Sequence, residues 1–136
     1  MKQRELTKRE IGEIFEEHAA EFYRQKGYSV LFHSYRYQQY EIDLIVKKKD
    51  VVVFVEVKSG NAKNGFDPID RVDNEKMRKI DLCAEGFKKM LKQKKIAVEE
   101  FSFRYDAVGI LYDDEMNLLQ IERQKDYYRP NPHKMG

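Results

Sequence analysis

The first third of the chain carries the apolar pattern of one helix followed by one strand. Segment Thr7-Lys8-Arg9-Glu10 has the Thr-x-x-Glu spacing of a capping box, which predicts that a helix begins there. Gly27 is placed to end this helix, because glycine adopts positive φ without strain. Segment 28–35 is rich in aromatic and branched residues and predicts a strand. The stripe that we expect this helix to bury consists of Ile11, Phe15, Ala19 and Phe22, which recur at helical spacing.

The middle of the chain predicts two neighbouring strands. Segments 41–46 and 51–57 are strongly apolar and are separated only by the polar run Lys47-Lys48-Lys49-Asp50, which indicates a hairpin. Segment 51–57 is almost continuously apolar, as is typical of a central strand that is covered on both faces. Segment 59–70 contains two Gly, two Asn and one Pro, so we expect a loop there.

The second half of the chain predicts a long helix over residues 74–94 and strands over 101–112 and 118–121. The apolar face of the helix consists of Met77, Ile80, Ala84, Phe87 and Leu91. The element order is therefore helix, three strands, helix, two strands, which predicts an α/β fold with a mixed β-sheet flanked by helices. We expect one domain over residues 1–125 and a loosely ordered tail over residues 126–136, which contains two prolines.

The amino-acid composition restricts the class of protein but does not indicate a binding partner. Charged residues make up 37% of the chain, but the formal net charge is only +2, so binding to nucleic acid would require a local basic face. The single cysteine, Cys83, excludes an intrachain disulfide and fits a reducing compartment. The basic N-terminus is not followed by the apolar stretch of a secretory signal, and no run approaches the roughly 20 apolar residues of a membrane helix. We therefore expect a soluble, cytoplasmic protein with no membrane partner.

Strand geometry brings several charged residues of the predicted hairpin onto one face. Glu56 and Lys58 point to the same side of their strand, roughly 6–7 Å apart, because side chains alternate along a strand. If the hairpin turn is centred on Lys48-Lys49, Glu41 lies opposite Glu56, and Asp43 becomes the diagonal neighbour of Glu56 with backbones roughly 7–8 Å apart. All four side chains then share one face, whereas a slip of one residue would turn Asp43 to the other face.

Two carboxylates beside a lysine suit the metal-dependent hydrolysis of a phosphodiester bond. Asp43 and Glu56 are then close enough for their carboxylates to hold one hard cation, such as Mg²⁺, which also takes phosphate oxygens as ligands. Such a cation lowers the pKa of a bound water and neutralises charge on the phosphate. Lys58 is placed to orient the attacking water and to stabilise the negative charge that develops.

The same residues resemble the signature of a known family. Segment Tyr40-Glu41-Ile42-Asp43-Leu44-Ile45, a short gap, and then Phe54-Val55-Glu56-Val57-Lys58 look like the motifs of the bacterial YraN-type proteins. The resemblance extends from about Gly12 to Ile121. It includes Glu16, Ala19-Ala20, the Gly27-Tyr28 turn, Lys76 and Arg104-Tyr105-Asp106. It departs from the family pattern at Phe15 and Tyr40, where glycine is usual, and at Ser59-Gly60, near which a basic residue is common.

The resemblance implies a restriction-endonuclease-like fold, that of the PD-(D/E)xK nucleases, akin to archaeal Holliday junction resolvases. It implies Asp43, Glu56 and the carbonyl of Val57 as ligands of Mg²⁺ or Mn²⁺, Lys58 as the catalytic lysine, and Glu16 as a further acidic residue from the first helix. It also implies a DNA substrate, in branched or structured forms, and a symmetric homodimer if the substrate is a junction.

Each of these residues also has a plainer interpretation. Glu56 and Lys58 could form an ordinary ion pair at a sheet edge, although edge strands are seldom so apolar. Glu16 lies in a run of helical acids, which is usually a solvated face. Lys76 either reaches the site or is solvated, and the lysines of segment 88–95 are better explained as a solubilising helix end than as a phosphate-binding patch. Segment 59–70 either closes over a substrate or only connects two elements.

Three classes of function therefore remain after the sequence is considered. The first is a metal-dependent nuclease, and the second is a nucleic-acid-binding module that keeps the fold but does not cleave. The third is a protein-interaction domain in which the acids are relics. A fold alone does not distinguish these classes.

Overall fold

The computed structural model describes residues 5–65, 68–71 and 73–129, and confirms the predicted α/β fold. Its elements are α1 (Lys8–Gln25), β1 (Ser29–Tyr37), β2 (Tyr40–Lys48), β3 (Val51–Asn61), η1 (Ala62–Asn64), η2 (Pro68–Arg71), α2 (Asn74–Gln93), η3 (Val98–Glu100), β4 (Ser102–Tyr112) and β5 (Leu118–Gln124). The order of the helices and strands is the predicted one, with short 3₁₀ helices added between them. Within the described part of the chain, no helix is long and apolar enough to cross a membrane.

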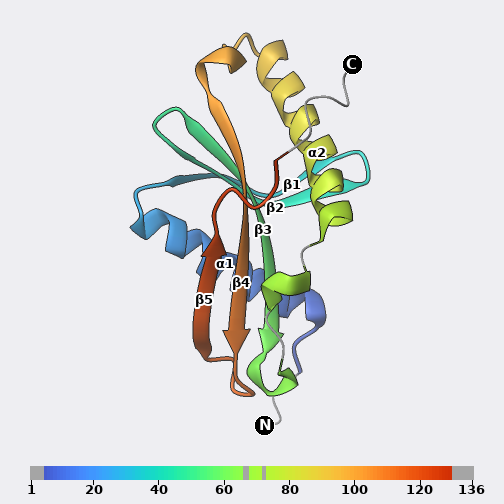
Figure 1. Ribbon diagram of the computed structural model, residues 1–136, viewed down its shortest axis with the longest axis vertical. Coiled ribbons are helices and arrows are strands. Elements are labelled where there is room, and N and C mark those ends of the chain that lie inside the picture. Colours follow the sequence, from blue (N-terminus) through green and yellow to red (C-terminus); the bar gives the residue numbers. More distant parts are fainter. Residues whose placement is uncertain (1–4, 66–67, 72, 130–136) are drawn as a thin grey trace.

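The five strands form one mixed sheet in the order β1-β2-β3-β4-β5. Strands β3 and β4 are parallel, and the other neighbouring pairs are antiparallel. Figure 1 shows β3, β4 and β5 side by side, with the β1–β2 hairpin crossing beyond them. The apolar segment at the start of β3 is thus the central strand that its sequence predicted.

Each face of the sheet is covered by one helix. On one face, α2 contributes Met77, Ile80, Ala84 and Phe87 to a buried cluster that also contains Phe54 of β3. On the other face, α1 contributes Phe15, Ala19, Ala20 and Tyr23 to a cluster that also contains Val53, Val55 and Val57. The two clusters explain why β3 is apolar at successive positions, since its alternate side chains enter different cores.

Helix α1 begins as predicted. The Thr7 hydroxyl accepts a hydrogen bond from the Glu10 N–H (3.1 Å), and the Glu10 carboxylate accepts one from the Thr7 N–H (3.0 Å). Gly27, two residues after the last helical residue, has φ +92°, which confirms its predicted role at the helix end. The predicted buried stripe omitted Tyr23, which is fully buried because its hydroxyl finds a partner inside the protein.

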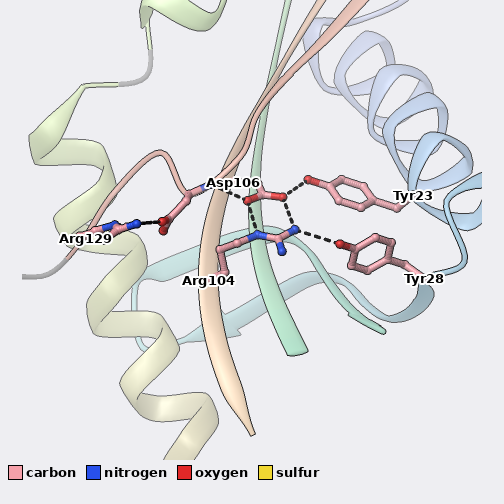
Figure 2. A network of polar contacts seen from close by, with 6 residues as sticks. Tyr23, Tyr28, Arg104, Asp106 and Arg129 are labelled. Carbon is pink, nitrogen blue, oxygen red and sulfur yellow. Dashed lines mark hydrogen bonds and ion pairs between the residues drawn. The ribbon is translucent and has the colours of Figure 1, made fainter. Parts of the chain in front are cut away.

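That partner is Asp106, the centre of a buried polar network (Figure 2). The Asp106 carboxylate accepts hydrogen bonds from the Tyr23 hydroxyl (2.7 Å), from Arg104 Nε (2.8 Å) and Nη2 (2.9 Å), and from the Asp126 N–H (2.9 Å). Arg104 also donates to the Tyr28 hydroxyl (3.0 Å). The network joins α1, β4 and the chain after β5, and leaves no charge without a partner.

Residues after β5 continue to contact the body of the protein as far as they are described. The Tyr127 N–H donates to the Tyr105 carbonyl (2.7 Å), and the ring of Tyr128 packs edge-on against the ring of Tyr105 (5.6 Å between centroids). Residues 130–136, the larger part of the predicted tail, lie outside the described residues.

The predicted register of the β2–β3 hairpin is wrong by two residues. The turn consists of Lys49 and Asp50, and Lys48 pairs directly with Val51. Lys49 has φ +55°, the left-handed conformation that lets a two-residue turn follow the twist of its strands. Because the error is an even number, the paired residues 44–48 and 51–55 keep their predicted faces. Only the pairing changes, so that the diagonal relation predicted between Asp43 and Glu56 is wrong.

The predicted loop over 59–70 begins too early. Ser59, Gly60 and Asn61 belong to β3, where they pair with residues 110–112 of β4. The parallel partner strand supplies hydrogen bonds to these residues, and this overrides the turn-forming tendency of their side chains. The rest of the segment contains η1 and η2, and Ile69 of η2 is buried against the α2 side of the sheet.

Helix α2 approaches the end of the β1–β2 hairpin at Gly86. A Cβ atom at this position would lie 2.3 Å from ring atoms of Tyr37, well inside van der Waals contact. Glycine is therefore required for the close packing of the helix on this hairpin.

We expect Gly86→Ala to lower the free energy of unfolding by about 1–3 kcal/mol, because the added methyl group must displace the Tyr37 ring. Gly12→Ala is the matched control, since a Cβ atom at this helical glycine meets nothing within 4 Å. It should raise the free energy of unfolding by about 0.5–1 kcal/mol. Urea denaturation measures both changes, and equal stability of the two variants would contradict the packing described.

Candidate active site

The candidate site lies where β2 separates from β3. The β2–β3 ladder ends at the pair Leu44 and Val55, whereas β3 remains paired with β4 as far as Asn61. Extending the observed register by one residue brings Asp43 opposite Glu56. The two carboxylates that the sequence singled out therefore lie close together where β2 and β3 cease to pair.

Asp43 is fixed by the backbone of β3. Its Oδ2 accepts a hydrogen bond from the Val57 N–H (2.8 Å), and the residue is partly buried. The N–H and C=O groups of one residue in a strand point to the same side. The carbonyl of Val57 therefore also points toward Asp43, as a third oxygen close to the two acids.

Glu56 is an almost fully buried carboxylate, with 1% of its surface exposed. Its Oε1 lies 3.6 Å from Lys58 Nζ and 3.6 Å from Lys76 Nζ, while its Oε2 is buried without a hydrogen-bond partner among the described residues. Burial and the neighbouring Asp43 carboxylate raise the pKa of Glu56 to about 8. The interpretation of Glu56 and Lys58 as an exposed surface pair is therefore wrong.

The pKa of Asp43 is raised as well, because burial outweighs the hydrogen bonds from the Val57 N–H and from the protonated Glu56 carboxyl group, and the positive charges of Lys76 and Lys58. Ionising both Asp43 and Glu56 is therefore unfavourable. A positive charge held between them would relieve this repulsion.

Glu16 reaches the same region from α1. Its Oε1 is buried without a hydrogen-bond partner among the residues described, and its pKa is raised to about 7 by burial and by the charges of Asp43 and Glu41. Its helical neighbours Glu13 and Glu17 are exposed, so the solvated-face interpretation holds for them and not for Glu16. Glu41 is half-buried and pairs with Arg36 (3.2 Å).

The structure also answers the question that the sequence left open about Lys76. Lys76 in the first turn of α2 reaches Glu56, together with Lys58 from β3. Sequence reasoning missed Asp73 and Lys79, which line a cavity with these two lysines. The available signal was the i, i+3 spacing of Lys76 and Lys79 directly after a helix-capping aspartate.

No group of three or more His, Cys, Asp or Glu side chains within residues 5–65, 68–71 and 73–129 is arranged to hold a metal ion. The ligand set expected from the sequence is different in kind, since it consists of two carboxylates and one backbone carbonyl. Mg²⁺ commonly takes only one or two carboxylates from a protein and keeps several waters. The partnerless Oε2 of Glu56 fits such a cation, because it is a buried acceptor for which the described residues provide no donor.

Comparison with known proteins identifies the family. The model of the family described as "Uncharacterised protein family UPF0102" matches residues 15–110. The chain belongs to this family. It is the family of the YraN-type proteins that the motifs resembled, within the PD-(D/E)xK nuclease superfamily. The UPF0102 match includes Glu16, Asp43, Glu56 and Lys58.

Relatives with the name "UPF0102 protein" cover most of the chain. The one from Kosmotoga olearia is 38% identical over 109 residues, which are 80% of this chain and 89% of the relative. The one from Caldicellulosiruptor saccharolyticus is 30% identical over 90% of this chain and 100% of its own length. A third, from Dictyoglomus turgidum, is 31% identical over 93% of this chain and 98% of its own length. The similarity to UPF0102 proteins thus extends over nearly the whole described structure.

The raised pKa of Glu56 predicts that, in the absence of divalent cations, the free energy of unfolding decreases as the pH rises. Between the ordinary pKa of 4.5 and the folded pKa of about 8, the unfolded chain ionises Glu56 while the folded chain keeps it protonated. Stability is therefore lost as pH rises through this window, by at most about 1.4 kcal/mol per pH unit. Glu56→Gln removes this loss, and we expect its stability relative to the parent to increase by on the order of 2 kcal/mol from pH 5 to pH 8.

Urea denaturation in the presence of a chelator, repeated across this pH range, measures the difference in the free energy of unfolding between Glu56→Gln and the parent protein. Glu99→Gln is the matched control, because Glu99 is exposed and should show a difference that does not vary with pH. A constant difference between Glu56→Gln and the parent protein would show that Glu56 ionises normally in the folded state.

Proposed function

We propose that this protein is a nuclease that hydrolyses DNA phosphodiester bonds with the help of Mg²⁺ or Mn²⁺. One observation carries the proposal: the buried Glu56 carboxylate, with one oxygen that has no hydrogen-bond partner among the described residues, lies next to Asp43 and beside the Lys58 ammonium group, where β2 and β3 cease to pair. A protein that needed these groups only for stability would gain by replacing them with apolar residues of similar volume. The membership in a nuclease superfamily supports the same reaction.

Asp43, Glu56 and the carbonyl of Val57 would hold the cation, since oxygen ligands suit these hard ions. When bound, such a cation lowers the pKa of a coordinated water and offsets charge on the scissile phosphate. Lys58 contributes a mobile ammonium group, because its side chain is 32% exposed and its ion pair with Glu56 is longer than a hydrogen bond. It orients the attacking water and stabilises the charge that develops on the phosphate. Glu16 supplies a further acceptor from α1 for water in the site.

The substrate class rests on family resemblance and on the charges near the site. The net charge of +2 provides little general attraction for DNA, so lysines beside the acids must supply the affinity. Branched or structured DNA is the form that the resemblance favours. A four-way junction has two equivalent strands to cut, and a symmetric homodimer would present two sites to it.

A second candidate is a nucleic-acid-binding module that keeps the fold without cleaving. The observation in its favour is that the side chains of the described residues do not form a metal-binding group of three. In this case Lys58 and Lys76 would hold phosphate groups, and the acids would only position the lysines.

We expect Asp43→Ala and Glu56→Ala to abolish Mn²⁺ binding, because each removes one of the two carboxylate ligands. Lys58→Ala should bind Mn²⁺ with nearly unchanged affinity but cleave at least about 100-fold more slowly, since it loses only the group that assists proton transfer and charge stabilisation. Isothermal titration with Mn²⁺ measures binding. Cleavage of single-stranded, duplex and four-way-junction DNA measures activity.

Glu99→Ala is the control for both assays, since it removes an exposed carboxylate elsewhere on the surface. Cleavage that persists undiminished in Asp43→Ala and Glu56→Ala would assign any nuclease activity to another site. Salt-dependent DNA binding without cleavage under any of these conditions would favour the second candidate instead.

A further inference from the structure

A polar cavity of about 250 Å³ lies on the α2 side of the sheet, beside the lysines that pair with Glu56. It is lined by Lys58 of β3 and by Asp73, Glu75, Lys76 and Lys79 from the start of α2. Three ammonium groups and two carboxylates thus border one cavity, whose lining has an excess of one positive charge. The arrangement provides more cations than the cleavage of a single bond requires.

Lys76 does not serve the stability of its helix. The start of a helix carries the positive end of its dipole, where lysine is unfavourable by about 0.3–1 kcal/mol and where anions are favoured. Asp73 caps the helix by accepting a hydrogen bond from the Lys76 N–H (2.8 Å), so the cap itself needs no lysine side chain. Lys79, one turn further along the helix, forms an i, i+4 ion pair with Glu75 (4.0 Å). Lys76 therefore adds to the positive potential of the helix end instead of balancing it.

The Lys76 ammonium group is close to Glu56 but does not form a hydrogen bond with it. The separation of 3.6 Å between Lys76 Nζ and Glu56 Oε1 exceeds a hydrogen bond, and the same oxygen is shared with Lys58. The Lys76 side chain is 42% exposed, so its ammonium group can meet a ligand in the cavity. Lys79 is similarly available, since its nearest carboxylate, Glu75, is 4.0 Å away on an exposed helix face.

We propose that Lys76, with Lys79 at the rim, binds a phosphate group of the DNA backbone in this cavity, next to the phosphate that is cleaved beside Lys58. The inference rests on the proposed function in so far as it names DNA as the ligand. It assigns α2 the task of holding the substrate strand across the site, while β2 and β3 supply the reacting groups. Lys76 is then a substrate-binding residue, and its pairing with Glu56 is the arrangement before substrate enters.

The competing explanation is that Lys76 only neutralises Glu56. The Glu56→Gln background separates the two, because it removes the negative charge and leaves Lys76 in place. It also removes a proposed metal ligand, so that DNA binding can be measured in a chelator without cleavage. The probe is a short fluorescent DNA duplex, titrated by anisotropy at several KCl concentrations.

If Lys76 binds phosphate, adding Lys76→Ala to Glu56→Gln should weaken DNA binding about tenfold and reduce the slope of log affinity against log salt by about one. Lys76→Arg should retain most of the affinity, because it keeps the charge. Lys79→Ala should weaken binding less, as expected for a rim position. Lys92→Ala, at the exposed far end of α2, is the matched control and should leave binding unchanged.

Equal DNA affinity with and without Lys76→Ala in the Glu56→Gln background would overturn the inference, and so would the absence of any salt-dependent DNA binding. These outcomes can be told apart from a failure of the nuclease proposal. If the parent protein cleaves DNA but Lys76→Ala does not change DNA binding, only the phosphate-binding role of Lys76 is contradicted. If Lys76→Ala weakens DNA binding but the parent protein does not cleave, the phosphate-binding role stands and the nuclease proposal is contradicted.

Discussion

The central strand is paired unequally on its two sides, and the candidate site is built on this inequality. Strand β3 has a partner on both sides up to Val55, and beyond this point only β4 continues beside it. The N–H of Val57 would then lack a partner inside the protein, and the Asp43 carboxylate takes the place of the missing strand by accepting its hydrogen bond. The separation of β2 from β3 thus leaves the Val57 N–H to the Asp43 carboxylate, and this hydrogen bond fixes the first acidic group of the candidate site.

Asp106 and Glu56 are both buried carboxylates, but they differ in how their charge is compensated. Asp106 is satisfied by four hydrogen bonds from Tyr23, Arg104 and the Asp126 backbone, and it joins three parts of the chain. Glu56 has two lysines at ion-pair distance but no hydrogen bond from either, and one oxygen without a hydrogen-bond partner among the described residues, so burial and the nearby Asp43 raise its pKa. The first arrangement stabilises the fold, whereas the second opposes folding and is tolerated because apolar cores lie on both faces of the sheet. This difference separates the candidate site from an ordinary buried polar network.

The elements of the fold were predictable because their signals are local. The capping box at Thr7, the apolar stripes of both helices and the continuous apolar run of β3 each depend on residues close in sequence. The errors arose where a distant partner decides the outcome. Residues 59–61 were expected in a loop, but pairing with β4 extends the strand through them. The hairpin register was two residues off, because the left-handed conformation of Lys49 permits a shorter turn than expected.

Local sequence patterns were enough to predict the order of the elements and the shared side of Glu56 and Lys58 on β3, and the motifs pointed to the family. Strand alternation is a property of the backbone, so the relation between Glu56 and Lys58 does not depend on the hairpin register. Contacts across the fold were needed to place Asp43 against the Val57 N–H next to Glu56, to bury Oε1 of Glu16 while its helical neighbours stay exposed, and to bring Lys76 to the site. These results depend on how α1 and α2 pack on opposite faces of the sheet, and that packing is set by contacts between residues far apart in the chain.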